Sequence, residues 1–196
     1  MSQLTAFKQH LKPGEIYRRE ELAQWSNAVD RHIAEAVSDG TLQKLSAGLY
    51  YFLTESVFGQ LPPEDSALVR AFLKDDRFLI TSPSSYNALG VGTTQLYNTT
   101  TVYNHKRHGK FKLGNRTFDF HMKHYFPDTV TKEFLLVDLV NNLHQLAEDP
   151  KEVLKTVAVK LKSMDRKKLV HLNNTYASIK AKKLLSPLLK ELDHVN

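Results

Sequence analysis

The stretch VDRHIAEAVSDGTLQKLSAGLYYFL, residues 29–53, decides the fold that we expect for this chain. Its first half has apolar residues at the i, i+4, i+7 and i+8 spacing of one buried helix face. These residues are Val29, Ile33, Ala36 and Val37. Gly40 follows where a left-handed C-cap belongs. The first half therefore predicts an amphipathic helix that ends just before Gly40.

The second half of this stretch predicts a β-hairpin. Residues 41–45 and 49–53 are rich in strand-forming side chains, and Ser46-Ala47-Gly48 separates them. Upstream, a helix over 5–11 ends at Pro13-Gly14, and a short helix covers 18–24. Helix, short helix, helix and hairpin is the order of a winged helix-turn-helix, whose third helix enters the major groove of DNA.

The remainder of the chain predicts a second domain. Pro62 and Pro63 can neither continue a strand nor enter a helix interior, so we place a linker at 59–63 between a winged-helix domain, 1–58, and a mixed α/β domain, 64–196. The fold class is α+β. The expected elements of the second domain are a helix to 74, a strand over 78–81, a short helix over 82–89, strands within 95–103, 110–113 and 116–123, and four helices from 131, divided near 149–150, 164–165 and 173–174.

The amino-acid composition indicates the cellular compartment and the kind of binding partner. The 196 residues include no cysteine, which excludes disulfides and thiolate metal sites and predicts a cytoplasmic protein. Apolar runs such as Phe134–Val140 are too short to span a membrane. The formal net charge of +6 suggests a polyanionic partner, yet residues 1–60 hold six Lys and Arg against seven Asp and Glu. The positive excess therefore lies after residue 60.

The third predicted helix carries the candidate DNA-reading residues. Its outer face holds Asn27, Arg31, Ala34, Glu35 and Ser38. Arg31 is suited to guanine, Asn27 to adenine, and Ser38 to a base or a phosphate. Helix-start and wing positions supply phosphate contacts from Arg18, Arg19, Lys44 and Ser46. The alternative is that this face is a solvated surface of a winged-helix domain that binds protein.

A basic stretch lies in the second predicted domain. Residues 103–112 interleave aromatic side chains with cations, which is typical of single-strand binders. An exposed basic hairpin has the same pattern, because lysines protect sheet edges. We expect Lys106, Arg107, Lys110 and Lys112 to form an accessory basic surface.

Histidine pairs could suggest a metal site. His105 and His108, and His121 and His124, are three residues apart. On a strand, side chains at i and i+3 leave opposite faces, so we expect no metal site. The chain also lacks a phosphate-binding loop, a Gly-x-Ser-x-Gly motif and a His-Glu-x-x-His motif, so we predict neither an enzyme nor a cofactor. A nuclease or an RNA-modifying enzyme that uses the histidine-rich hairpin remains the third alternative.

Several segments together resemble the AbiEi-type antitoxins of the bacterial abortive-infection system and related transcriptional regulators. They lie in order over residues 14–125 and include Gly14–Tyr17, Asn27–Arg31, Asp39–Tyr51, Ala88–Val91 and Lys112–Gly114. The resemblance implies a winged helix that binds inverted repeats in its own promoter. It also implies a C-terminal domain that counteracts a nucleotidyltransferase toxin in a type IV pair, without a stable complex.

We therefore expect a cytoplasmic DNA-binding regulator that acts as an antitoxin. Its DNA partner is a double-stranded, inverted-repeat operator, which requires two winged helices and so a dimer on DNA. The alternative is a protein-interaction module that uses the winged helix and the basic second domain without binding DNA.

Overall fold

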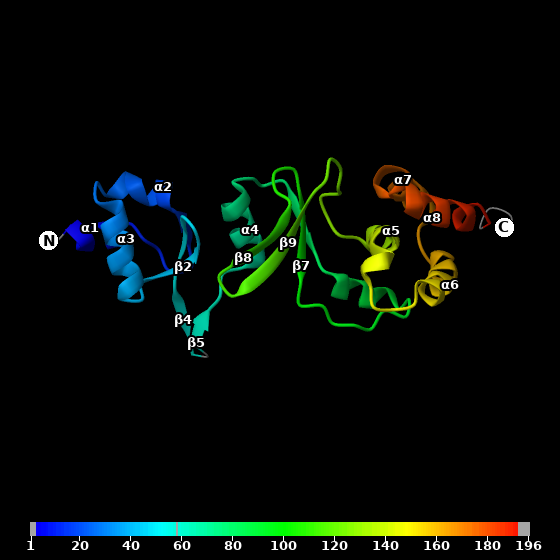
Figure 1. Ribbon diagram of the computed structural model, residues 1–196, viewed down its shortest axis with the longest axis horizontal. Helices are drawn as coiled ribbons and strands as arrows, with labels where there is room; N and C mark the ends of the chain where they lie inside the picture. The colour runs from blue at the N-terminus through cyan, green and yellow to red at the C-terminus, as the bar shows by residue number, and fades with distance from the viewer. Residues whose placement is uncertain (1–2, 58, 192–196) are drawn as a thin grey trace. The chain divides into compact units, whose positions relative to one another are not determined.

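The computed structural model describes residues 3–57 and 59–191 and has a mixed α+β fold (Figure 1). The chain forms two compact units. The first unit comprises residues 1–76 and 110–118, and the second unit comprises residues 77–109 and 119–196. The α+β class predicted from the sequence is confirmed. Among the described residues, no helix combines the length and the apolar character needed to cross a membrane.

Helices and strands alternate at the start of the first unit. The elements are α1 (Gln3–Gln9), β1 (Ile16–Arg18), α2 (Arg19–Leu22), the 3-10 helix η1 (Ala23–Trp25), α3 (Val29–Ser38), β2 (Leu42–Ser46) and β3 (Leu49–Phe52). Strands β1 and β2 both pair antiparallel with β3, which gives the sheet order β1-β3-β2. Buried Phe7, Leu22 and Leu42 join the helices and the sheet in one core.

The buried face of α3 differs from the prediction at two positions. It is confirmed at Val29, Ile33 and Ala36. Val37 is 37% exposed, so its predicted burial is wrong, and His32 is buried instead. His32 packs against Phe7 with ring centroids 5.6 Å apart, and its Nδ1 lies 2.8 Å from Ser26 Oγ. Because this hydrogen bond satisfies the ring nitrogen, a polar side chain can fill the core position.

Two glycines lie where the sequence predicts them, one between α3 and the β2–β3 hairpin and one in the turn of that hairpin. Gly40 has φ of +79° and follows Asp39, the C-cap of α3, and Gly48 has φ of +70° in the turn. The carbonyl of Gly48 accepts a hydrogen bond from the backbone N–H of Arg19 at 2.9 Å. This bond fixes the turn beside the start of α2, and only a glycine adopts such φ values without strain.

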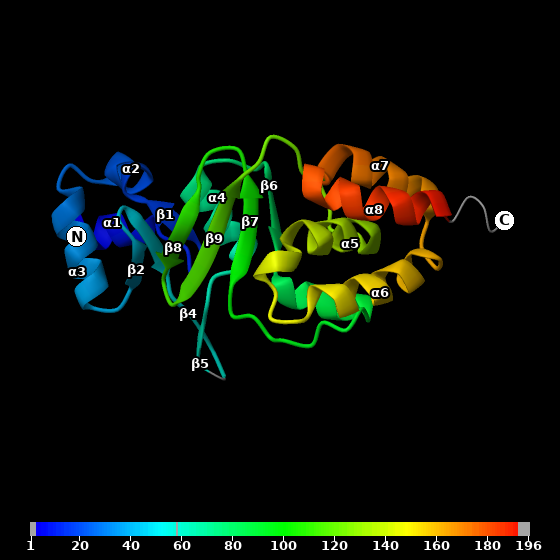
Figure 2. The ribbon, with the colours of Figure 1, turned by 45° about the vertical axis from the view of Figure 1, so that its right-hand side comes forward.

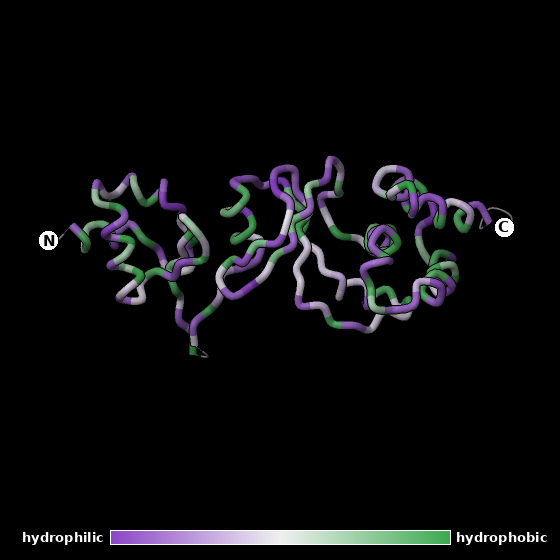
Figure 3. Tube along the Cα trace, viewed as in Figure 1, coloured by the Kyte–Doolittle hydropathy of each residue, from purple (hydrophilic) through white to green (hydrophobic). Residues whose placement is uncertain are grey.

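The segment around the predicted linker is structured and belongs to the first unit. Strand β4 (Thr54–Ser56) pairs with β5 (Gly59–Leu61), and β5 ends directly before Pro62. Val57, directly after β4, is 94% exposed. Figure 3 shows hydrophobic colour at the tip of this hairpin.

Helix α4 (Asp65–Leu73) is also part of the first unit. Arg18 Nε donates to the carbonyl of Ala71 at 3.0 Å, and Arg116 pairs with Asp65. Because these bonds tie α4 to β1 and to residues 110–118, the compact units divide at Asp76 and not at 59–63.

A four-stranded sheet has the order β6-β7-β9-β8. Its strands are β6 (Phe78–Thr81), β7 (Thr100–Asn104), β8 (Gly109–Leu113) and β9 (Arg116–Met122), and the 3-10 helix η2 (Pro83–Leu89) follows β6. The strand expected within 95–103 begins only at Thr100. Glu148 accepts hydrogen bonds from the backbone N–H groups of Thr94 and Gln95 at 3.0 and 3.3 Å. These amides are satisfied by a side chain, so this part of the loop needs no strand partner.

Helices form the rest of the second unit. They are α5 (Lys132–Asn142), the 3-10 helix η3 (Leu143–Gln145), α6 (Pro150–Leu161), α7 (Arg166–Tyr176) and α8 (Ile179–Glu191). Asp149 and Asp165 cap α6 and α7, which confirms two of the predicted divisions. The division predicted near 173–174 is wrong, because α7 continues to Tyr176.

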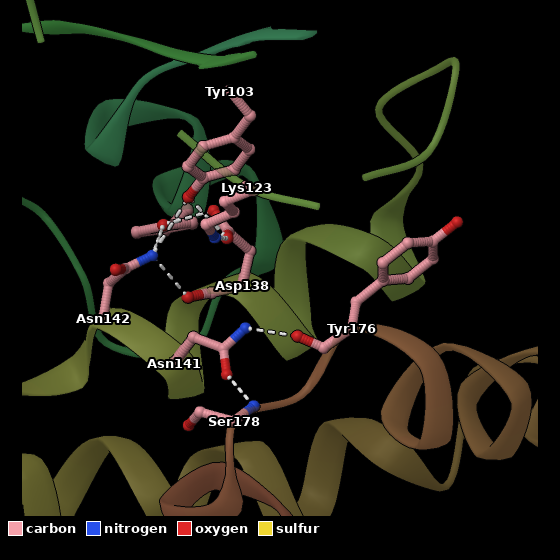
Figure 4. Close-up of polar contacts among 8 residues, drawn as sticks. Tyr103, Lys123, Asp138, Asn141, Asn142, Tyr176 and Ser178 are labelled. Carbon is pink, nitrogen blue, oxygen red and sulfur yellow. Dashed lines mark hydrogen bonds and ion pairs between the residues drawn. The ribbon is translucent and has the colours of Figure 1, made fainter. Parts of the chain in front are cut away.

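Asn141 of α5 fixes the true connection between α7 and α8. Its amide donates to the carbonyl of Tyr176 at 3.1 Å and accepts from the N–H of Ser178 at 2.7 Å (Figure 4). Figure 2 shows α7 and α8 side by side next to α5.

Candidate functional site

The residues predicted to read DNA lie on α3 and just before it. Arg31 and Ser38 are exposed on α3, and Asn27 is exposed two residues before the helix begins at Val29. Arg31 Nε lies 3.8 Å from Glu35 Oε1, one helical turn further along. Arg31 can therefore reach a partner in solution, but it shares this face with a carboxylate that would repel phosphate.

The two arginines at the start of α2 already have protein partners. Arg19 makes a bidentate ion pair with Asp30, with N–O distances of 2.7 and 2.6 Å. The hydrogen bonds from Arg19 lower the pKa of the Asp30 carboxyl, and those to Asp30 raise the pKa of Arg19. Arg18 is bonded to Ala71 and lies 3.6 Å from a carboxylate oxygen of Glu21. Sequence reasoning placed these arginines correctly at a helix start but did not find their carboxylate partners.

Lys44 and Ser46 flank an irregular position in β2. The register with β3 shifts between them, from Lys44 opposite Tyr50 to Ser46 opposite Leu49. Lys44 is exposed and Ser46 is half-buried. The turn between the strands contains only Ala47 and Gly48. The hairpin thus offers one clear cation and a short tip for phosphate contacts.

The predicted accessory basic surface is divided between the two units. Lys106 and Arg107 belong to the second unit, whereas Lys110 and Lys112 lie on β8 in the first unit. Asn104 Oδ1 accepts hydrogen bonds from the N–H groups of Lys106 and Arg107 at 2.8 and 2.7 Å. This bonding explains the local turn at Lys106 and Arg107.

The histidines lie in a different arrangement from their sequence spacing. His108 and His121 have ring centroids 5.6 Å apart, and His121 Nε2 lies 3.2 Å from Asp119 Oδ2. His105 stacks on Phe126 at 4.8 Å. Within residues 3–57 and 59–191, no group of three or more histidines and carboxylates is arranged to hold a metal ion.

A buried carboxylate in the second unit was missed by sequence reasoning. Asp138 of α5 has 0% exposure and accepts hydrogen bonds from two tyrosine hydroxyls (Figure 4). Tyr86 donates to Oδ2 at 2.7 Å, and Tyr103 donates to Oδ1 at 2.6 Å. The Asn142 amide lies 3.2 and 3.3 Å from the same two hydroxyl oxygens. The only sequence signal was one acidic residue inside the apolar run 134–140.

Lys123 completes this buried cluster. Its ammonium lies 3.8 Å from Asp138 Oδ1 and 3.6 Å from the centre of the Tyr103 ring. Its side chain is 33% exposed, so it connects the buried carboxylate with solvent. Burial lowers the pKa of Lys123, and the attraction of Asp138 opposes that shift. Burial and the charge of Asp138 raise the pKa values of both tyrosines far above the usual 10.

Comparisons with known proteins define the fold and go no further. No protein-family model matches the chain, and no curated protein sequence matches it. The crystal structure of the RV2827C protein from Mycobacterium tuberculosis is similar, with a TM-score of 0.59 and 15% sequence identity. The match covers 96% of this chain and 75% of that chain. At this identity, the similarity concerns the fold alone.

Removing the buried carboxylate should strongly destabilise the second unit. We expect Asp138→Ala to lower the free energy of unfolding by about 3–5 kcal/mol, because Lys123 and two buried hydroxyls lose their acceptor. Urea denaturation followed by circular dichroism measures the change. Glu152→Ala is the control, since its pair with Lys155 is exposed and should contribute less than about 1 kcal/mol. Equal effects of the two substitutions would contradict the role of Asp138.

The two buried tyrosines should make stability depend on alkaline pH. Folding raises their pKa values, so the folded chain keeps these protons where the unfolded chain releases them. This contribution is complete below about pH 10 and is lost as the pH rises further. The double variant Tyr86→Phe, Tyr103→Phe should lose less stability between about pH 9 and pH 11 than the parent in urea titrations. A parallel loss in both proteins would show that other groups cause the dependence.

Proposed function

We propose that the chain is a winged-helix DNA-binding transcriptional regulator that acts in the cytoplasm as the antitoxin of a type IV toxin–antitoxin pair. The first unit supports the DNA-binding part of this proposal. Its order of α1, β1, α2, α3, β2 and β3, with the sheet order β1-β3-β2, fits a winged helix-turn-helix. The main support is that α3, the third helix in that order, presents Arg31 and Ser38 to solvent, and that Asn27 is exposed just before the helix begins.

The electrostatics of the two units differ, and this shapes the proposed DNA binding. The first unit holds 11 Lys and Arg and 11 Asp and Glu, so its formal charge is zero. The second unit holds 16 Lys and Arg and 10 Asp and Glu, so it carries the whole net charge of +6. In the proposed complex, α3 supplies base contacts and the second unit supplies most of the attraction to phosphate. Binding should therefore weaken steeply as salt rises.

Phosphate must compete with carboxylates for the arginines of the first unit. Arg19 leaves or shares Asp30, and Arg31 leaves Glu35, when either one contacts DNA. Both pairs are largely exposed, so exchanging one anion for another costs little. An operator of inverted repeats presents two half-sites, and two copies of the chain then bind as a dimer on DNA.

The same ion pairs favour a second candidate function. A surface on which Asp30 neutralises Arg19 of α2 and Glu35 neutralises Arg31 of α3 also fits a protein-interaction surface. In this alternative the winged helix and the basic second unit bind protein partners, and no DNA binding occurs at any salt concentration.

The antitoxin part of the proposal rests on the resemblance of residues 14–125 to the AbiEi-type antitoxins. In that scheme the functional partner is a nucleotidyltransferase toxin, which the second unit counteracts without a stable complex. The proposal includes neither an enzymatic activity nor a cofactor for this chain.

Arg31 should decide how well the protein distinguishes its operator. We expect Arg31→Ala to reduce the preference for the DNA upstream of its reading frame over random duplex by about 1–3 kcal/mol. Gel-shift titrations with both duplexes measure the preference. Arg70→Ala is the matched control, because Arg70 is an exposed arginine of the first unit on α4 that pairs with Asp76.

Glu35→Gln separates the two candidate functions. It removes a phosphate-repelling charge and the partner of Arg31, so a DNA-facing α3 should bind all duplexes more tightly. Unchanged DNA binding in both the Arg31 and the Glu35 variants would show that α3 does not contact DNA. Failure of the parent chain to bind any duplex at low salt would favour the protein-interaction alternative.

Protection against the toxin should be separable from DNA binding. We expect the chain to restore growth of cells that produce the nucleotidyltransferase encoded by an adjacent reading frame. Arg31→Ala should protect equally, because the proposed protective surface lies in the second unit. Growth curves measure protection, and size-exclusion chromatography of the mixed proteins should show no stable complex. Absence of protection by the parent chain would remove the antitoxin assignment while leaving DNA binding intact.

A further inference from the structure

Lys123 lies at the edge of the buried Asp138 cluster and has no role in the proposed function. It directly follows β9, and its backbone N–H donates to the carbonyl of Asn104 at 2.8 Å. This bond holds the residue beside the end of β7. The side chain is 33% exposed, so its amine is held against the cluster while solvent reaches part of the side chain (Figure 4).

The ammonium of Lys123 lacks hydrogen-bond acceptors. It lies 3.8 Å from Asp138 Oδ1, which is longer than a hydrogen bond. Both Asp138 oxygens already accept hydrogen bonds from the hydroxyls of Tyr86 and Tyr103. Within the described part of the chain, the ammonium makes no hydrogen bond to any residue. Because an ammonium has three N–H donors, covering it without acceptors costs free energy.

The same position nevertheless favours a positive charge. The Asp138 carboxylate attracts a cation at Nζ, and the centre of the Tyr103 ring lies 3.6 Å from this atom. A cation above the face of an aromatic ring is stabilised by the ring quadrupole. The site therefore suits a cation that has fewer N–H donors than an ammonium.

We propose that Lys123 is a site at which small aldehydes form a reversible Schiff base. The nitrogen lone pair forms the new C–N bond, and the π electrons of the C=O bond move to the aldehyde oxygen. The two protons that the ammonium loses leave with this oxygen as water. An ammonium and an aldehyde thus give an iminium and water, with the total charge unchanged. The iminium keeps its attraction to Asp138 and to the Tyr103 ring, but it has one N–H donor instead of three.

Burial supports the reaction and selects the aldehyde. It lowers the pKa of Lys123, so a larger fraction of this amine is neutral and nucleophilic at neutral pH than of an exposed lysine. Because only 33% of the side chain is exposed, the carbonyl carbon must be unhindered to reach the nitrogen. Small aldehydes meet this condition, and ketones or branched aldehydes do not.

Reductive trapping of propanal on the full chain tests this proposal. The chain is equilibrated with propanal at neutral pH and reduced with borohydride, and peptide mass spectrometry then measures the modified fraction of each lysine. We expect Lys123 to be half-modified at a propanal concentration about fivefold or more below that for Lys183, because the iminium removes two unsatisfied donors. Lys183 is the internal control, since it is an exposed lysine of α8 in the same unit.

Matched variants and conditions locate the effect. Lys123→Gln should abolish the modification that occurs at low propanal concentration, whereas Lys183→Gln should retain it. Pivaldehyde, whose carbonyl is hindered, should modify Lys183 in preference to Lys123. In urea that unfolds the chain, the two lysines should react with propanal to the same extent, because the covered site no longer exists.

Three results would overturn the proposal. One is modification of Lys123 that only equals or falls below that of Lys183 in the folded chain. A second is a preference for Lys123 that persists in urea, which would show that the neighbouring sequence is the cause. The third is a preference of pivaldehyde for Lys123, which would show that the covered side chain does not select small aldehydes.

Discussion

The buried carboxylate of Asp138 is the interaction on which the second unit depends. A charge with no exposure is tolerated only when donors surround it, and here they come from separate parts of the chain. Tyr86 reaches it from η2, Tyr103 from β7, and Lys123 from the end of β9. The strands, η2 and α5 must therefore keep one relative placement, because any slip would leave a buried polar group unpaired.

This constraint extends to the helices beyond α5. Asn141, three residues after Asp138, holds the connection between α7 and α8 through Tyr176 and Ser178. The carboxylate fixes α5, and Asn141 fixes the α7–α8 helix pair against α5.

The sequence predicted the first unit well because its signals are local. Helix periodicity, Gly40 and the glycine turn at Gly48 act within about ten residues of chain, and the corresponding elements all form. What it missed depends on residues far apart in the chain. His32 packs in the core against Phe7 of α1, and the first unit extends to α4 because Arg18 meets Ala71. The Asp138 cluster joins residues up to 56 positions apart, which no local pattern encodes.

The distribution of charge bears on how the proposed regulator would work. An electrically neutral first unit gains little from DNA in general, so its contacts contribute mainly to discrimination between sequences. The second unit, with all of the net +6, attracts any polyanion regardless of sequence. Specificity and affinity would then reside in different units. The ion pairs of Arg19 with Asp30 and of Arg31 with Glu35 are largely exposed, so phosphate can replace these carboxylates at little cost.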